Sequence, residues 1–220
     1  MADLGEHGVR TPEQEAHYAE LKAQRGRLDG LYGTLTLHRG LAEMMLAIGR
    51  FYRTAATVPD RYREAATLAV ATETRCAYVW SKHEPTARSA GLPQPAIEAL
   101  RAGRYDDPAL SAEDRDAIAV ALEALALRSI PADLQERAIA TWGVEGLLEL
   151  SVLAGVYRMI AGYLASIDVP LPDDGVTETT EGSWFPPVAV HVPVGVSTRW
   201  PARSAAPARR ARSWGPSKIG

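Results

Sequence analysis

Hydrophobic residues recur at the spacing of an α-helix along most of this chain. Two groups each mark one apolar helix face: Leu41, Met44, Met45, Ile48, Phe51 and Tyr52 in the first quarter, and Ile118, Leu122 and Leu125 near the middle. Charged residues occupy the positions between them, as on amphipathic helices. The alternation that is typical of strands is almost absent before residue 185. The pattern therefore predicts an all-α fold.

Proline and glycine mark the ends of the predicted helices. Gly91 is predicted to end one helix in the left-handed backbone region, and Pro93 suits the first turn of the next. Further breaks are expected at residues 58–60, around 103–108, at Pro131 and at Gly143. The prediction is a bundle of seven or eight helices, at about residues 12–29, 38–54, 60–74, 76–90, 94–102, 111–128, 131–141 and 144–167.

The composition changes after residue 169. Proline, glycine and threonine become frequent first, and arginine, alanine, proline and serine dominate the end. We expect a helical domain over residues 1–172 and an extended or disordered tail over residues 173–220. The alternative is that residues 188–196 add one strand or a swapped arm to a neighbouring copy.

Charge and hydropathy exclude some classes of partner. The chain of 220 residues has a net charge of −3, but six basic residues and no acid lie within residues 198–220. The rest of the chain is therefore acidic, which gives no reason to expect specific nucleic-acid binding.

The most hydrophobic segment, residues 143–167, contains Glu145, Glu149 and Arg158. So many charges indicate a core helix rather than a membrane span.

Two further features of the sequence bear on the cellular location of the protein. Its first residues lack the basic and then apolar order of a secretory signal. Its single cysteine cannot form an internal disulfide, which agrees with a reducing compartment. We therefore predict a cytoplasmic protein.

Candidate chemistry gathers around that cysteine. Glu64 precedes Cys76 by twelve residues, so in one unbroken helix of about 100° per residue the two would lie about 120° apart. A contact between them requires a break, and Thr72, Thr74 and Arg75 are plausible places for it.

Cys76 and His83 are seven residues apart and fall on one helix face, with Val79 between them. A helix N-terminus or a nearby imidazolium lowers the pKa of a thiol from about 8.5, and both would act on Cys76. Glu64 would supply an acid–base partner for the histidine. The alternative is that Cys76 is a small buried hydrophobe and His83 a hydrogen-bonded core residue.

This region contains Glu64, Cys76, the A-Y-V-W segment and His83 in that order, and a segment that loosely matches A-x-x-x-A-G-L follows. The order resembles that of the carboxymuconolactone decarboxylase superfamily, which includes alkyl hydroperoxidase D (AhpD). Residues 147–160 resemble its closing helix, so the likeness covers about residues 38–167. The resemblance implies an AhpD-like helical bundle, assembly as a homotrimer or homohexamer, and pockets near the subunit contacts.

The activity that the resemblance implies depends on the branch. The hydroperoxidase branch has two cysteines, and Val79 occupies the position of the second, so this chain resembles a single-cysteine member. Reduction of hydroperoxides, a peroxiredoxin-type activity, would then need an external thiol. The decarboxylase branch matches at Glu64 and His83, which implies acid–base chemistry on a lactone or organic acid. A helical oligomer that binds a ligand without turnover is the third hypothesis.

The expected catalytic residues are thus Glu64, Cys76 and His83, and the expected substrate-binding residues are Tyr78, Val79 and Trp80. The aromatic pair has a second interpretation, as packing at the core or a subunit contact. Glu149 is expected to form a structural ion pair with Arg75 or Arg63. The chain has no motif for a metal, a nucleotide, a flavin or a nicotinamide, so we predict no cofactor.

Overall fold

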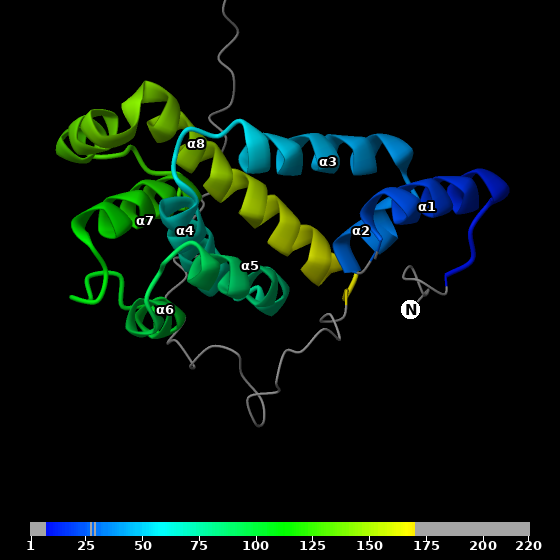
Figure 1. The fold of residues 1–220 in the computed structure, drawn as a ribbon, viewed down its shortest axis with the longest axis horizontal. Helices are drawn as coiled ribbons and strands as arrows, with labels where there is room; N and C mark the ends of the chain where they lie inside the picture. Colours follow the sequence, from blue (N-terminus) through cyan, green and yellow to red (C-terminus); the bar gives the residue numbers. More distant parts are fainter. Residues whose placement is uncertain (1–7, 27, 29, 170–220) are drawn as a thin grey trace, which may run out of the picture. The chain divides into compact units, whose positions relative to one another are not determined.

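The computed structural model describes residues 8–26, 28 and 30–169. These ranges contain eight helices and no strand, which confirms the predicted all-α fold (Figure 1). The helices are α1 (Pro12–Arg25), α2 (Gly30–Leu35), α3 (Arg39–Thr54), α4 (Asp60–Glu73), α5 (Ala77–Ser89), α6 (Gln94–Arg101), α7 (Ala112–Leu125) and α8 (Ala132–Ser166). The predicted tail lies outside the described residues, and so do residues 188–196.

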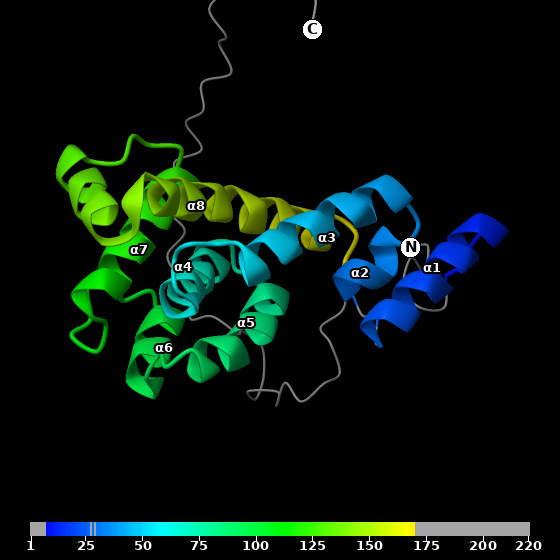
Figure 2. The same cartoon turned by 45° about the horizontal axis from the view of Figure 1, so that its top comes forward.

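Helix α4 is the central element, because it packs against α5, α6, α7 and α8 (Figure 2). All residues from 65 to 72 are buried, and alanine occupies half of these positions. Leu68 and Ala69 face one hydrophobic cluster, and Ala66 and Val70 face the other. Small side chains therefore let several helices approach α4 closely.

The predicted break after α4 is present. Helix α4 ends at Glu73, and Arg75 adopts a positive φ of 54°. The amide of Arg75 donates to the carbonyl of Thr72 (3.0 Å) and that of Cys76 to the carbonyl of Ala71 (2.9 Å). This is the hydrogen-bond pattern of a Schellman motif, with arginine in the place that glycine usually takes. It reverses the chain and brings α5 back against α4.

Helix α5 ends in the same way. Gly91 has a φ of 90°, its amide donates to the carbonyl of Arg88 (3.0 Å), and the amide of Leu92 donates to the carbonyl of Ala87 (3.0 Å). The prediction that Gly91 ends a helix in the left-handed region is therefore confirmed.

Helix α2 does not follow from the sequence pattern. That pattern predicts one helix over residues 12–29, whereas α1 ends at Arg25 and a separate short helix follows. Helix α2 is held by α5, since the amide of Leu31 donates to the hydroxyl of Tyr78 (3.2 Å). A Cβ atom on Gly30 would lie 2.4 Å from the Tyr78 ring, so only glycine permits this approach.

Helix α8 combines two of the predicted helices. Gly143 interrupts it with a φ of 74° and a ψ of 176°, a region that is essentially restricted to glycine. The bend brings the following turn close to Trp142, because a Cβ atom on Gly146 would lie 2.3 Å from the Cβ of Trp142. Both glycines are therefore required by the backbone path.

Among the described residues, α8 is long and apolar enough by composition to cross a membrane. Its buried Glu149, however, accepts hydrogen bonds from the amides of Thr57 (2.8 Å) and Val58 (3.0 Å) and from the Thr57 hydroxyl (3.0 Å). The expected ion pair of Glu149 with an arginine is therefore wrong: the carboxylate binds the loop before α4, and Arg63 pairs with Asp60 instead. These contacts are those of a packed core helix.

Exposed apolar side chains remain on α3 and α8. They are Leu41, Met44 and Phe51 on α3, and Ile139, Val144, Leu148, Val152 and Met159 on α8. Large exposed apolar patches often mark contacts between proteins. The expected homotrimer or homohexamer stays a prediction, as does the cytoplasmic location.

Candidate functional site

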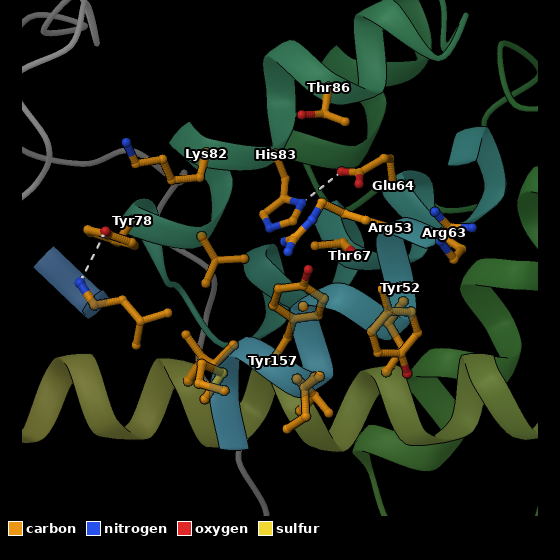
Figure 3. Close-up of a pocket in the computed structure, with 18 of the residues that line it drawn as sticks. Tyr52, Arg53, Arg63, Glu64, Thr67, Tyr78, Lys82, His83, Thr86 and Tyr157 are labelled. Carbon is orange, nitrogen blue, oxygen red and sulfur yellow. Dashed lines mark hydrogen bonds and ion pairs between the residues drawn. The ribbon is translucent and has the colours of Figure 1, made fainter. Parts of the chain in front are cut away.

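A cavity of about 550 Å³ opens between α2, α3, α4, α5 and α8, and Arg25 at the end of α1 also lines it (Figure 3). Its apolar wall includes Leu31, Met45, Ile48, Leu153, Val156 and Ile160, and its polar wall includes Glu64, Thr67, His83 and Tyr157. A volume in the range of small-molecule pockets, with a few polar groups in an apolar surface, is typical of a ligand site.

Glu64 and His83 meet in this cavity. The Nδ1 atom of His83 lies 2.8 Å from Oε2 of Glu64, and the two side chains are 23% and 12% exposed, respectively. Glu64 comes from the first turns of α4 and His83 from the middle of α5. The chain reversal at Arg75 places these two helices side by side.

The hydrogen bond determines which nitrogen is available. An ionised carboxylate only accepts hydrogen bonds, so Nδ1 of His83 carries the hydrogen that it donates to Glu64. In the neutral ring, Nε2 then holds the free electron pair. Figure 3 shows this second nitrogen on the side of the ring away from Glu64. His83 is thus oriented as a proton acceptor toward the cavity.

Tyr157 of α8 forms the next part of the polar wall. Its ring packs edge-to-face on His83, with 4.9 Å between the ring centroids and an angle of 84° between the planes. Burial raises the pKa of Tyr157, the negative charge of Glu64 adds to the effect, and a hydrogen bond with Thr67 opposes it. The phenol therefore stays neutral near pH 7 and can donate a hydrogen bond.

Cys76 does not line the cavity, unlike Glu64 and His83. It is buried at 9% exposure and belongs to the hydrophobic cluster around α4. Burial raises its pKa, although the amides of Val79 and Tyr78 act in the opposite direction. The expected lowering of this pKa is wrong, because desolvation of the thiolate outweighs the helix N-terminus.

Only two of the three expected substrate-binding residues line the cavity. Val79 and Tyr78 line the cavity. Trp80 does not line it: the side chain is fully buried and donates from Nε1 to the carboxylate of Glu84 (2.7 Å). Arg101 covers the indole ring at 4.7 Å and pairs with Glu84 at 2.5 Å. Trp80 is a core residue, the second of the two interpretations that the sequence allowed.

The contribution of α3 to the cavity could not be predicted from the sequence. Tyr52 and Arg53 of this helix line the cavity together with residues of α5 and α8. Burial and the charge of Glu149 raise the pKa of Tyr52 to about 12. The signal in the sequence is the apolar face of α3, which predicts burial but not what the helix covers.

Part of the chain matches a known family. The model of the family described as "Carboxymuconolactone decarboxylase family" matches residues 39–124, which include Glu64, Cys76 and His83. Comparison with curated proteins gives no match.

Proposed function

We infer from the family match over residues 39–124 that this chain is a member of the carboxymuconolactone decarboxylase superfamily, and we propose that it is an enzyme that transfers protons on a lactone or organic acid. The observation that supports this proposal is the Glu64–His83 pair in an open cavity. A histidine held by a carboxylate on one side, with its other nitrogen toward a ligand, is a common general base.

In the proposed reaction, Nε2 of His83 takes a proton from a carbon next to the substrate carbonyl. The electron pair of the broken C–H bond forms a C=C bond to the carbonyl carbon, and the π pair of the C=O bond moves onto the oxygen. Glu64 stabilises the imidazolium that forms. The imidazolium then returns the proton to another position of the substrate. In a decarboxylation, His83 instead starts as the imidazolium: the C–C bond to the carboxylate breaks, carbon dioxide leaves, and Nε2 protonates the carbanion.

The proposal is tested by proton exchange, which does not require the natural product to be known. The protein is incubated in D₂O with a series of lactone acids and β-keto acids, and deuterium uptake is followed by proton NMR. We expect wild-type protein to speed the exchange or release carbon dioxide with at least one of them. Equal rates for wild-type protein and His83→Ala with every compound would contradict the proposal.

Tyr157 is expected to donate a hydrogen bond to the oxygen that becomes negative. Replacing Tyr157 by phenylalanine should lower kcat about 100-fold, because loss of one such donor usually costs that much. Tyr163→Phe is the matched control on the same helix, since Tyr163 donates to Thr34 (2.6 Å) and does not line the cavity. Steady-state kinetics of both variants measure the difference, and equal kcat values would exclude this role.

Cys76 is expected to be dispensable for the reaction. Because its thiol is buried and outside the cavity lining, Cys76→Ala should keep kcat within about threefold of the wild-type value. The hydroperoxidase alternative makes the opposite prediction. If wild-type protein with dithiothreitol consumes cumene hydroperoxide in an electrode assay and Cys76→Ala does not, the thiol is the reacting group.

A further inference from the structure

The charged side chains that line the cavity differ in how they are paired. Arg63 donates to the carbonyl of Val58 and pairs with Asp60 at 2.5 Å, and Glu64 is paired with His83. Arg25 lies over the ring of Tyr32 at 4.0 Å. Lys82 also has a partner. Each of these charges is therefore already engaged within the protein.

Arg53 is different. Within the described ranges its guanidinium forms no hydrogen bond or ion pair, although the residue lines the cavity. It is an exposed residue of α3, and in Figure 3 its guanidinium points to the part of the cavity that holds His83. A guanidinium with five N–H donors and no protein acceptor is suited to bind an anionic group.

The helix itself directs Arg53 toward the cavity. Long helical side chains lean toward the N-terminus of their helix, over the residue four positions earlier. For Arg53 that residue is Gly49, another lining residue, and a Cβ atom there would lie 3.0 Å from Nη1 of Arg53 and 3.3 Å from the hydroxyl of Tyr32. The absence of a side chain at Gly49 thus leaves room for the guanidinium beside the cavity.

We propose that Arg53 binds the carboxylate of the substrate in this cavity and so selects acids over neutral compounds of the same shape. This inference rests on the proposed function, because it takes the cavity as the substrate site. The apolar wall then holds the carbon skeleton. The carboxylate at Arg53 fixes which carbon of that skeleton reaches Nε2 of His83.

The test compares acids with their amides, which have nearly the same shape and no charge. The probes are benzoate, phenylacetate and cyclohex-1-enecarboxylate, each with its primary amide, and dissociation constants are measured by titration in protein NMR. For wild-type protein we expect at least one acid to bind about tenfold more tightly than its amide, as for a charge-assisted hydrogen bond at a partly exposed site. Arg53→Gln should remove this preference, and Arg53→Lys should keep part of it.

Arg50→Gln is the matched control, because Arg50 is exposed on the same helix one turn earlier and does not line the cavity. It should keep the full preference. Loss of the preference in Arg50→Gln, an unchanged preference in Arg53→Gln, or no preference in wild-type protein for any of the three pairs would overturn the proposal. Phenyl phosphate in place of phenylacetate distinguishes a carboxylate site from a phosphate site, and tighter binding of the phosphate contradicts the assignment.

Failure of the two proposals can be told apart. His83→Ala removes proton transfer but leaves Arg53 in place, so its preference for the acid should equal that of wild-type protein. A protein without turnover that still prefers the acid through Arg53 would contradict the proposed function alone. Turnover without any role of Arg53 in acid binding would contradict this inference alone.

Discussion

Replacing His83 by alanine or Glu64 by glutamine is expected to lower kcat about 10²- to 10⁴-fold, the usual range for loss of a general acid or base. The two side chains share one hydrogen bond of 2.8 Å and act as a unit. The double variant should therefore be no slower than the slower single variant. Deuterium exchange or turnover with the best acid from the substrate series measures all three rates.

Glu98→Gln is the control for the glutamate substitution, because Glu98 is exposed on α6 and does not line the cavity. It should react at the wild-type rate. If the effects of the two single substitutions multiply in the double variant, Glu64 and His83 act independently, and Glu64 does not work by supporting one base.

The second large effect is on stability. Gly143→Ala should lower the free energy of unfolding by about 2 kcal/mol, because residues with side chains are strained at a φ of 74° and a ψ of 176°. The kink that Gly143 makes also places Val58 and Trp142 around Gly146. A strained kink would loosen this packing as well. Urea denaturation followed by circular dichroism gives the difference.

Gly155 provides the matched control on the same helix. A Cβ atom on Gly155 would meet no neighbour within 4 Å, and the residue lies in a regular helical stretch. Gly155→Ala should therefore raise the free energy of unfolding by about 0.5–1 kcal/mol, because alanine loses less backbone freedom on folding. A Gly143→Ala variant as stable as Gly155→Ala would show that the kink is not required.

Much of the fold could be predicted because its determinants are local. Prolines and glycines place most helix ends within two residues of those observed, and the break between α4 and α5 lies at a position where threonine, a modest helix former, made one plausible. Helix α2 could not be predicted in this way. It has six residues, two of them glycines, and it is held by Tyr78 from 47 residues away.

The candidate site could be predicted from the sequence only in part, because some of its residues meet through long-range contacts. Glu64 and His83 lie on neighbouring helices in sequence, so their spacing carried information. Arg53 and Tyr157 come from α3 and α8, and only the packing of distant helices brings them to the cavity. No periodicity indicates that kind of contact.

Cys76 shows a limit of helical projection. The spacing of seven residues places it on the face of His83 only if both residues are helical. Cys76 is instead the residue before α5, with a φ of −91° and a ψ of 89°. The angle of 100° per residue does not apply at such a position, and the side chain enters the core.

The central claim is that Glu64 holds the ring of His83 with Nε2 free toward the cavity. Long-range ¹H–¹⁵N NMR spectra of protein labelled at histidine nitrogen measure this directly, with the signals assigned through His83→Ala. At a pH where the ring is neutral, we expect His83 to carry its hydrogen on Nδ1 and Glu64→Gln to weaken this preference. A neutral His83 with its hydrogen on Nε2, unchanged in Glu64→Gln, would contradict the claim.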